Sequence, residues 1–301
     1  MLLWPRTPNA KPQTPNAKRQ TPNAKTLDSA GQELFEGKIE SAVDMEALKP
    51  KPAEQHLIEM RSNREAWRRR RLLRVIYSRF YGLIRENLAP LPEPVVELGS
   101  GIGAVKEFIP QCITTDIFPN PWLDRRENAY ALNFPDESLS NLILLDVFHH
   151  LQFPGTALDE FRRVLIDNGR VIIMEPAMGL LGRIVYGFFH HEPLRLHEPI
   201  TWLAPDGFDP ERADYFAAQG NASRVFLKRE FEGKLQPWNM LRCEQLPEIA
   251  YLASGGFSKP QLYPAAALPV VRGLEKVLAV WPDLFATRLL VVLAKPSTQQ
   301  K

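Results

Sequence analysis

From Pro94 onward the chain alternates between short apolar runs and segments in which apolar residues recur every three or four positions. The apolar runs predict strands at residues 95–98, 112–116, 128–131, 142–147 and 171–175. Their lack of strict alternation is typical of strands that are buried on both faces. The helical spacing predicts helices at residues 104–109, 157–165 and 179–189. Strands that alternate with helices indicate βαβ units and a mainly parallel sheet.

The segment before Pro94 has a different pattern. Apolar residues at helical spacing between Leu72 and Ile84 predict a helix that ends near Asn87, ahead of Pro90. The opposite face is basic, and a solvated helix face is the plainest interpretation. Contact with an anionic lipid surface or an acidic substrate group is the alternative. The basic positions are Arg68, Arg69, Arg70, Arg71, Arg74 and Arg79.

Residues 1–45 contain a tandem repeat, TPNAKPQ-TPNAKRQ-TPNAK, that begins at Thr7. Every unit contains proline and lacks large apolar residues, so the repeat can neither form a coiled coil nor offset the entropy of ordering. We therefore predict a disordered, repeat-containing leader over 1–45 and a helical region over 54–92.

Composition narrows the class of protein. Of the 301 residues 45% are apolar, which is enough to bury at least one sizeable core. A net charge of +2 gives no argument for nucleic acid as a partner. Cys112 and Cys243 are far apart in sequence, which favours a reducing compartment, and we expect neither a secretory signal nor a spanning helix. The expected location is cytoplasmic, with peripheral contact at the inner membrane through the arginine face as an open alternative. The sequence indicates no oligomeric state.

Residues 95–103 are the most informative stretch. An apolar run leads into a carboxylate and three alternate glycines: Glu97, Gly99, Gly101 and Gly103. Glycine tolerates positive φ and lets the backbone approach a ligand closely. An acidic residue at this turn favours a ligand with a cationic or amino group over a phosphate. The spacing also differs from the G-x-G-x-x-G of dinucleotide folds, because Ala104 holds the third glycine position. The pattern favours S-adenosylmethionine.

Ligands of open α/β sheets bind outside the carboxyl ends of the strands, so the residues at those ends are site candidates. Asp116 ends the second predicted strand, 19 residues after Glu97, where a carboxylate can accept both hydroxyls of a ribose. Asn128 and Ala129 in the third strand are placed to contact an adenine edge. Asp146 ends the fourth strand.

Residues 95–176 resemble the class I S-adenosylmethionine-dependent methyltransferases, in the type 11 group that includes quinone-biosynthesis C-methyltransferases. The resemblance rests on ELGSGIG at 97–103, Asp116, FPDESL at 134–139, FHHL at 148–151, and FRRVL and NGR within 161–170. YGFFHHEP at 186–193 is similar to a bacterial subgroup associated with cell-envelope genes. Asn128 stands where the family usually has Asp, and an uncharged acceptor there weakens cofactor binding by about 1 kcal/mol.

The resemblance implies a fold, a cofactor and a site. The fold is α/β, a Rossmann-like, doubly wound, mainly parallel seven-stranded sheet with N-terminal helices. The cofactor-binding core covers 93–190, a substrate-covering insertion 191–240, and a C-terminal part that completes the sheet 241–296. The implied activity is methyl transfer from S-adenosylmethionine to a small-molecule, lipid or glycan acceptor. The implied cofactor-binding residues are Glu97, Gly99, Ser100, Gly101, Gly103, Asp116, Asn128, Ala129 and Asp146.

Methyl transfer from a sulfonium is an in-line displacement that needs no protein nucleophile, but a hydroxyl acceptor needs a general base. The candidate bases are His149 and His150 at the fourth strand end, and His190 and His191 in the segment expected to cover the site. Shaping the pocket and hydrogen bonding to the backbone is the competing role for His149 and His150, whereas His190, His191 and His197 lie near Glu192 and Glu198 in a pattern that could mimic a metal cluster. Because no H-E-x-x-H pattern is present and prolines interrupt the region around His197, we expect no metal site.

Two other classes of protein stay open. A nicotinamide-dependent oxidoreductase would need the longer glycine spacing and a Tyr-x-x-x-Lys pair, and Tyr77, Tyr81 and Tyr186 have no lysine four positions on. A non-catalytic cofactor-binding or interaction protein would keep the glycines and lose an acceptor pocket. Aromatic residues that can line such a pocket, or serve as core, are Trp202, Phe208, Phe216, Trp238 and Tyr251.

Overall fold

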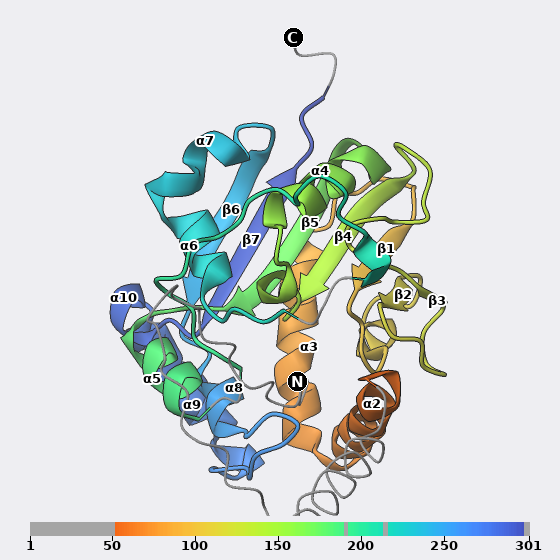
Figure 1. Ribbon diagram of the computed structural model, residues 1–301. Helices are drawn as coiled ribbons and strands as arrows, with labels where there is room; N and C mark the ends of the chain where they lie inside the picture. Colours follow the sequence, from red (N-terminus) through yellow and green to blue (C-terminus); the bar gives the residue numbers. More distant parts are fainter. Residues whose placement is uncertain (1–51, 190–191, 213–215, 298–301) are drawn as a thin grey trace, which may run out of the picture.

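The computed structural model describes residues 52–189, 192–212 and 216–297, so the predicted leader over 1–45 and the candidates His190 and His191 lie outside the described residues. The described chain forms one seven-stranded sheet in the order β3-β2-β1-β4-β5-β7-β6 (Figure 1). The strands are β1 Val95–Leu98, β2 Ile113–Asp116, β3 Arg125–Arg126, β4 Leu139–Leu145, β5 Leu165–Pro176, β6 Asn239–Leu246 and β7 Arg288–Ala294.

Strand pairing confirms the predicted fold class. The pairs β1–β2, β1–β4, β2–β3 and β4–β5 are parallel, while β7 runs antiparallel between β5 and β6. Buried residues form two apolar cores on the sheet, one that includes residues of α4 and α6 and one that includes residues of α3 and α8. The α-helices are α2 Pro52–Arg69, α3 Arg71–Glu86, α4 Pro154–Val164, α5 Leu180–Phe188, α6 Asn221–Leu227, α7 Glu232–Leu235, α8 Ile249–Ala253, α9 Leu268–Leu278 and α10 Pro282–Phe285.

The third strand differs from its prediction at 128–131. β3 lies at Arg125–Arg126, and Asn128 and Ala131 form only an isolated antiparallel bridge. The Oδ1 atom of Asn128 accepts a hydrogen bond from the Tyr130 backbone N–H at 3.0 Å, which bends the chain into a turn. The predicted helix after the glycine turn is a single 3-10 turn, η1 (Ala104–Glu107).

The N-terminal helical region is two helices that meet at Arg70. Its backbone is extended there (φ −96°, ψ 90°), and its guanidinium donates to the backbone oxygens of Gly256 and Lys259. Arg79 pairs with Glu248 at 2.8 Å, so two of the six arginines on the basic face hold the fold together. None of the helices in the described part of the chain combines the length and apolar character needed to traverse a bilayer.

Candidate functional site

A cavity of about 490 Å³ opens at the edge of the sheet where the parallel strands end. This volume falls within the roughly 300–1,000 Å³ typical of small-molecule sites. The cavity wall includes ten predicted site residues: Glu97, Gly99, Ser100, Gly101, Asp116, Asn128, Ala129, Asp146, His149 and His150. The structure therefore brings together in one cavity residues that the sequence placed at the ends of four strands.

The turn after β1 needs glycine because its backbone has positive φ and because neighbouring atoms leave no room for a Cβ. Gly99, Gly101 and Gly103 have φ values of +66°, +53° and +71°, a region that L side chains rarely adopt. A Cβ on Gly99 would lie 2.4 Å from Cγ2 of Val147. Gly103 does not line the cavity; a Cβ there would lie 2.7 Å from the backbone oxygen of Trp122. Gly103 thus lets the turn pack against the neighbouring loop.

Ser100 fixes the turn to the next strand. Its backbone N–H donates to the Thr115 oxygen at 2.7 Å, and its Oγ accepts from the Thr115 N–H at 3.1 Å. The same Oγ donates to the Glu97 backbone oxygen at 3.0 Å. These bonds hold the turn rigidly against β2, so its backbone is pre-organised for a ligand.

Glu97 is a buried carboxylate in the cavity wall, with 1% of its surface exposed. Its Oε1 accepts from the hydroxyl of Tyr81 at 3.0 Å, whereas Oε2 is buried and has no hydrogen-bond partner among the described residues. Burial raises the pKa of Glu97 to about 7. A ligand ammonium would satisfy the orphaned oxygen and favour the ionised form, so this carboxylate fits the amino group of S-adenosylmethionine.

Asp116, at the end of β2, is the second buried carboxylate. It accepts from the backbone N–H groups of Gly101 and Phe118, each at 3.2 Å. Burial raises its pKa, and the nearby ring of His56 offsets part of that rise. These bonds aim the carboxylate into the cavity, where it can accept hydrogen bonds from ribose hydroxyls.

The N-terminal helix α2 closes the cavity, which the sequence did not indicate. His56, Met60 and Asn63 on this helix line the wall. The His56 Nε2 atom lies 3.9 Å from Asp116 Oδ2, and Met60 Sδ lies 3.2 Å from the position of a Cβ on Gly101. Mostly polar and charged residues surround these three, so no apolar run marks them as site residues.

Asn128 is placed at the cavity wall but its side chain is used by the fold. Its Nδ2 donates to the Pro210 oxygen at 3.0 Å, and its Oδ1 holds the turn to Tyr130. The amide thus ties the segment around residue 129 to η3 (Pro210–Arg212). Adenine contact through this side chain stays a prediction.

Asp146 adopts a positive φ of 59° and forms a bidentate ion pair with Arg288 of β7. Burial raises the pKa of Asp146, but the guanidinium outweighs this effect and holds the pKa below its usual value. Arg288 is 1% exposed and lies over the ring of Tyr251, 4.4 Å from its centroid. The sequence missed Arg288 because it is 142 positions from Asp146 and starts an apolar strand.

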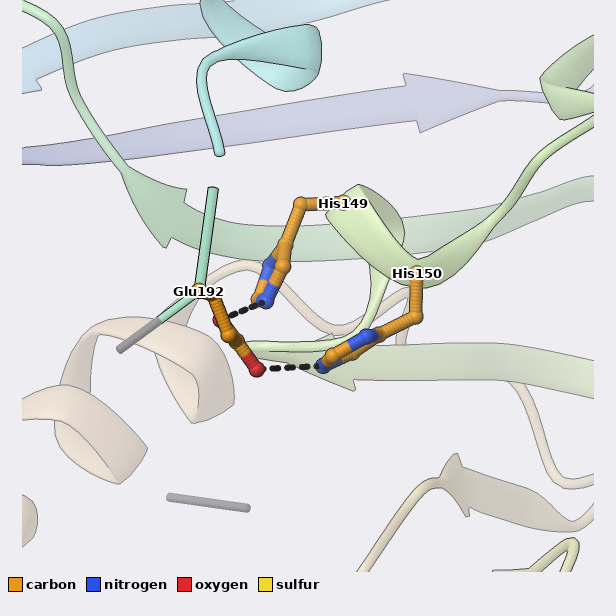
Figure 2. A group of neighbouring side chains, drawn as sticks. All are labelled: His149, His150 and Glu192. Carbon is orange, nitrogen blue, oxygen red and sulfur yellow. Dashed lines mark ion pairs between the residues drawn. The ribbon is translucent and has the colours of Figure 1, made fainter. Parts of the chain in front are cut away.

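His149 lies in the short helix η2 (Phe148–His150) between two carboxylates. Its Nδ1 is 2.6 Å from Glu175 Oε2. Its Nε2 is 3.2 Å from Glu192 Oε2, a contact that Figure 2 shows. Burial lowers the pKa of this ring, but Glu175 and Glu192 outweigh burial and raise it to about 10.

His150 lies beside it, with ring centroids 4.1 Å apart. Its Nδ1 is 3.0 Å from the Phe216 oxygen, and its Nε2 is 3.6 Å from Glu192 Oε1. Burial and the neighbouring His149 lower the pKa of His150 to about 4. A general base works best with a pKa near the working pH, and neither ring is tuned in that way.

The aromatic candidates divide into two groups. Phe216 and Tyr251 line the cavity. Trp202 packs on the core beside Gly155, Phe208 packs on Tyr130 and Phe153, and Trp238 is buried in the core.

Residues 96–173 match the family model described as a methyltransferase domain. This segment contains Glu97, the glycine turn, Asp116 and both histidines of η2. The chain carries a class I S-adenosylmethionine-dependent methyltransferase domain. Its cofactor is S-adenosylmethionine, and the two buried carboxylates and the glycine turn fit that cofactor. The resemblance of 186–193 to a cell-envelope subgroup stays a prediction.

No curated protein sequence matches the chain. Among solved structures, a methyltransferase from Thermotoga maritima, titled a possible histamine N-methyltransferase, has a TM-score of 0.45 and 14% identity over 76% of this chain and 94% of that chain. A methyltransferase from Archaeoglobus fulgidus has a TM-score of 0.43 and 14% identity over 74% and 94%. Geranyl diphosphate C-methyltransferase from Streptomyces coelicolor has a TM-score of 0.44 and 11% identity over 72% of this chain and 76% of that chain. Similarity at this level carries no information about the methyl acceptor.

Proposed function

We propose that this methyltransferase transfers the methyl group of S-adenosylmethionine to a small-molecule, lipid or glycan acceptor. The observation that carries the proposal is the continuity of one cavity of about 490 Å³, which extends from the glycine turn and Asp116 to His149 and His150. Donor and acceptor must occupy the same water-excluded space for an in-line displacement, and this cavity offers that space.

The donor half is formed by β1, β2 and α2. Glu97 is placed to bind the donor's amino group and Asp116 its ribose hydroxyls, while His56 and Met60 close the space above the turn. When bound, S-adenosylmethionine supplies an electrophilic methyl group on a sulfonium. Asp146 forms an ion pair with Arg288, and both side chains line the cavity.

The acceptor half is lined by His149, His150, Phe216 and Gln219. Holding the acceptor at attack distance contributes on the order of 7–11 kcal/mol to such a reaction, and this contribution needs positioning groups rather than a nucleophile. Because the pKa of neither histidine lies near 7, we assign both to positioning. His190 and His191, the other predicted bases, lie outside the described residues.

Calorimetric titration with S-adenosylmethionine, and with NAD as the competing ligand, tests the donor half. We expect Gly101→Arg and Asp116→Ala to weaken S-adenosylmethionine binding by more than about 100-fold. The arginine side chain would enter the cavity from a backbone φ of +53° that disfavours it, and Asp116→Ala removes the acceptor for the ribose hydroxyls. Matched controls are Gly233→Arg, at an exposed helical glycine with open space around it, and Asp136→Ala, at an exposed aspartate. Unchanged affinity in both site variants, or binding of NAD in place of S-adenosylmethionine, would contradict the proposal.

We also propose a peripheral membrane contact, which supports a lipid-borne acceptor. Arg68, Arg71 and Arg74 are exposed on α2 and α3. Two helices expose apolar side chains at helical spacing: Leu180, Ile184 and Phe188 on α5, and Val270, Leu274 and Val277 on α9. α5 also places Tyr186 in the cavity wall. Basic and apolar side chains together fit an anionic lipid surface.

The acceptor class can be found by incubating lipid, glycan and small-molecule fractions with methyl-labelled donor. We expect label in one fraction with the wild-type chain and none with Asp116→Ala. Label that appears equally with both proteins would contradict methyl transfer at this site.

A further inference from the structure

Glu192 is distant in sequence from the histidines at the end of β4, but the fold brings its carboxylate to both rings (Figure 2). We propose that His149, His150 and Glu192 form a binding site for a divalent transition-metal ion of the zinc class in the acceptor half of the cavity. One ligand atom from each residue lies within 4.8 Å of the others. The inference does not rest on methyl transfer, because metal binding can be measured without a methyl donor.

The spacing of the ligand atoms suits such an ion. Zinc binds imidazole nitrogen and carboxylate oxygen at about 2.0–2.2 Å, so a tetrahedral ion holds its ligand atoms roughly 3.4 Å apart. Glu192 Oε2 lies 3.2 Å from His149 Nε2, and Glu192 Oε1 lies 3.6 Å from His150 Nε2. Small movements of the carboxylate would place an ion between the three side chains.

The second nitrogen of each ring is already held in the way that metal-binding histidines require. His149 Nδ1 faces a Glu175 oxygen at 2.6 Å, and His150 Nδ1 faces the Phe216 backbone oxygen at 3.0 Å. A carboxylate and a carbonyl only accept hydrogen bonds, so each Nδ1 carries a proton. Nε2 of each ring faces Glu192, and a bound ion would take the place of the proton that His149 Nε2 carries in the metal-free protein. Carboxylate or carbonyl partners behind the ring are typical of metal sites.

Glu192 is held by Gln219, whose Nε2 donates to Glu192 Oε2 at 2.5 Å. Gln219 is 1% exposed and lies in the cavity wall, and its Oε1 is buried with no hydrogen-bond partner in the part of the chain that the structure describes. A buried amide oxygen left in this position would be satisfied by a water bound to the ion. Gln219 thus supports the three proposed ligands from outside the coordination shell of the ion.

Charge also favours a divalent ion. Glu175 and Glu192 are both buried, with 0% and 6% of their surface exposed. Buried carboxylates are rarely found without a charged partner or a metal ion, and a divalent cation beside Glu192 would supply such a partner.

Three protein ligands leave one tetrahedral position open. Sites of this kind hold a water or a substrate atom at that position, and the ion lowers the pKa of a bound hydroxyl. An acceptor oxygen in the cavity could complete the coordination. The ion would then orient the acceptor and ease loss of its proton, so that neither histidine has to act as the base.

The test is titration of chelator-treated full-length protein with Zn²⁺ by calorimetry, and with Co²⁺ by visible absorption, in the absence of S-adenosylmethionine. We expect saturable binding of one ion per chain and a Co²⁺ spectrum typical of tetrahedral nitrogen and oxygen ligands. His150→Ala and Glu192→Gln should each weaken binding by more than the roughly 100-fold that loss of an outer partner can cost. Glu175→Gln should weaken it by roughly 10- to 100-fold.

The matched controls are His197→Ala and Glu198→Gln, which change the same residue types at exposed positions of the same segment. Both should bind the metal as the wild type does, and circular dichroism should show that all variants are folded. The proposal is overturned if the wild type binds no stoichiometric Zn²⁺ or Co²⁺. It is equally overturned if His150→Ala and Glu192→Gln bind normally, or if the controls lose binding to the same extent.

Discussion

At the scale of single residues, Glu97 lowers the stability of the cofactor-free fold and is the same group that is placed to bind the cofactor. Its carboxylate is buried on β1 with one oxygen unpartnered, and burial raises its pKa to about 7. The ionised form is the one that can bind an ammonium, and it is also the form that burial disfavours. In the absence of cofactor, Glu97 therefore lowers the stability of the fold increasingly as pH rises from 4.5 to 7, and by the full amount above pH 7.

Glu97→Gln should raise the stability of the cofactor-free protein at about pH 8 by about 3 kcal/mol. Because the folded pKa of about 7 exceeds the ordinary value of 4.5, the contribution of Glu97 to stability is fully present below pH 4.5 and is lost as pH rises through 7. The gain should therefore shrink toward zero near pH 4.5. Urea unfolding at both pH values measures it, and the exposed Glu86→Gln is the control. An equal gain at both pH values would rule out this explanation.

The pair of Asp146 and Arg288 is the second residue-scale prediction. Arg288→Gln should lower the free energy of unfolding by about 3–5 kcal/mol, because it leaves a carboxylate with an unpaired charge in the wall of the cavity. The double variant with Asp146→Asn should recover part of that loss. A double-mutant cycle of chemical unfolding measures the coupling. Additive losses would show that the two side chains do not stabilise each other.

At the scale of elements, the sequence predicted the strands that consist of buried apolar runs. β1, β2, β4 and β5 all lie where such runs predicted strands, because both faces of each strand are covered. β7 is also a buried apolar strand, but it was predicted only as part of a C-terminal segment that completes the sheet. β6 was not predicted, since an edge strand with exposed residues such as Met240 and Leu241 carries no buried run. β3 consists of two exposed arginines and has no apolar signal at all.

The site was predictable to the same extent. Glu97, the glycines and Asp116 sit at strand ends and follow from local pattern. Site residues contributed by distant segments could not be predicted from local pattern. Tyr81 comes from α3, His56 from α2, Glu192 from the segment after α5, and Arg288 from β7. Each of these contacts joins residues through tertiary packing, which leaves no periodic signal in the sequence.

Gly99→Ala tests the turn between β1 and η1. The new Cβ would meet the branched side chain of Val147 at 2.4 Å, and the backbone φ of +66° disfavours alanine. We expect a loss of about 1–3 kcal/mol in unfolding free energy. Binding of S-adenosylmethionine should also weaken, because Val147 lies in the cavity wall.

The control is Gly233→Ala on α7, where a Cβ meets open space, so stability should stay the same or rise slightly. Thermal and urea unfolding report stability, and calorimetry reports affinity. A Gly99→Ala protein as stable as wild type would show that β1 and β4 can move apart without cost.

At the scale of the whole molecule, helices α2, α5, α8, α9 and α10 gather beyond the edge at which the parallel strands end (Figure 1). The opposite edge of the sheet has no comparable cluster of helices among the described elements. Helices α2, α5 and α8 of this cluster contribute residues to the cavity wall, so a surface that binds the cluster from outside lies close to the cavity. The proposed membrane contact would therefore bring a lipid-borne acceptor close to the cavity.

Co-sedimentation with vesicles that contain anionic lipid tests that contact. We expect the wild type to bind, with less binding at high salt because the arginine contribution is screened. Arg71→Glu with Arg74→Glu, and separately Leu274→Glu with Val277→Glu, should each reduce binding severalfold. Arg162→Glu on α4 is the control, as an exposed arginine on a different helix. Equal binding by all four proteins would remove the membrane proposal.

β7 enters the sheet between β5 and β6, although it is the last strand of the chain. During synthesis β6 therefore emerges before β7, the strand with which it pairs. Asp146 likewise has no ion pair with Arg288 until Arg288 has been synthesised. The edge of β5 stays open for the same period, and it is a strongly apolar edge. Because Arg288 also lines the cavity, the cavity wall is complete only after β7 has been synthesised, near the end of translation.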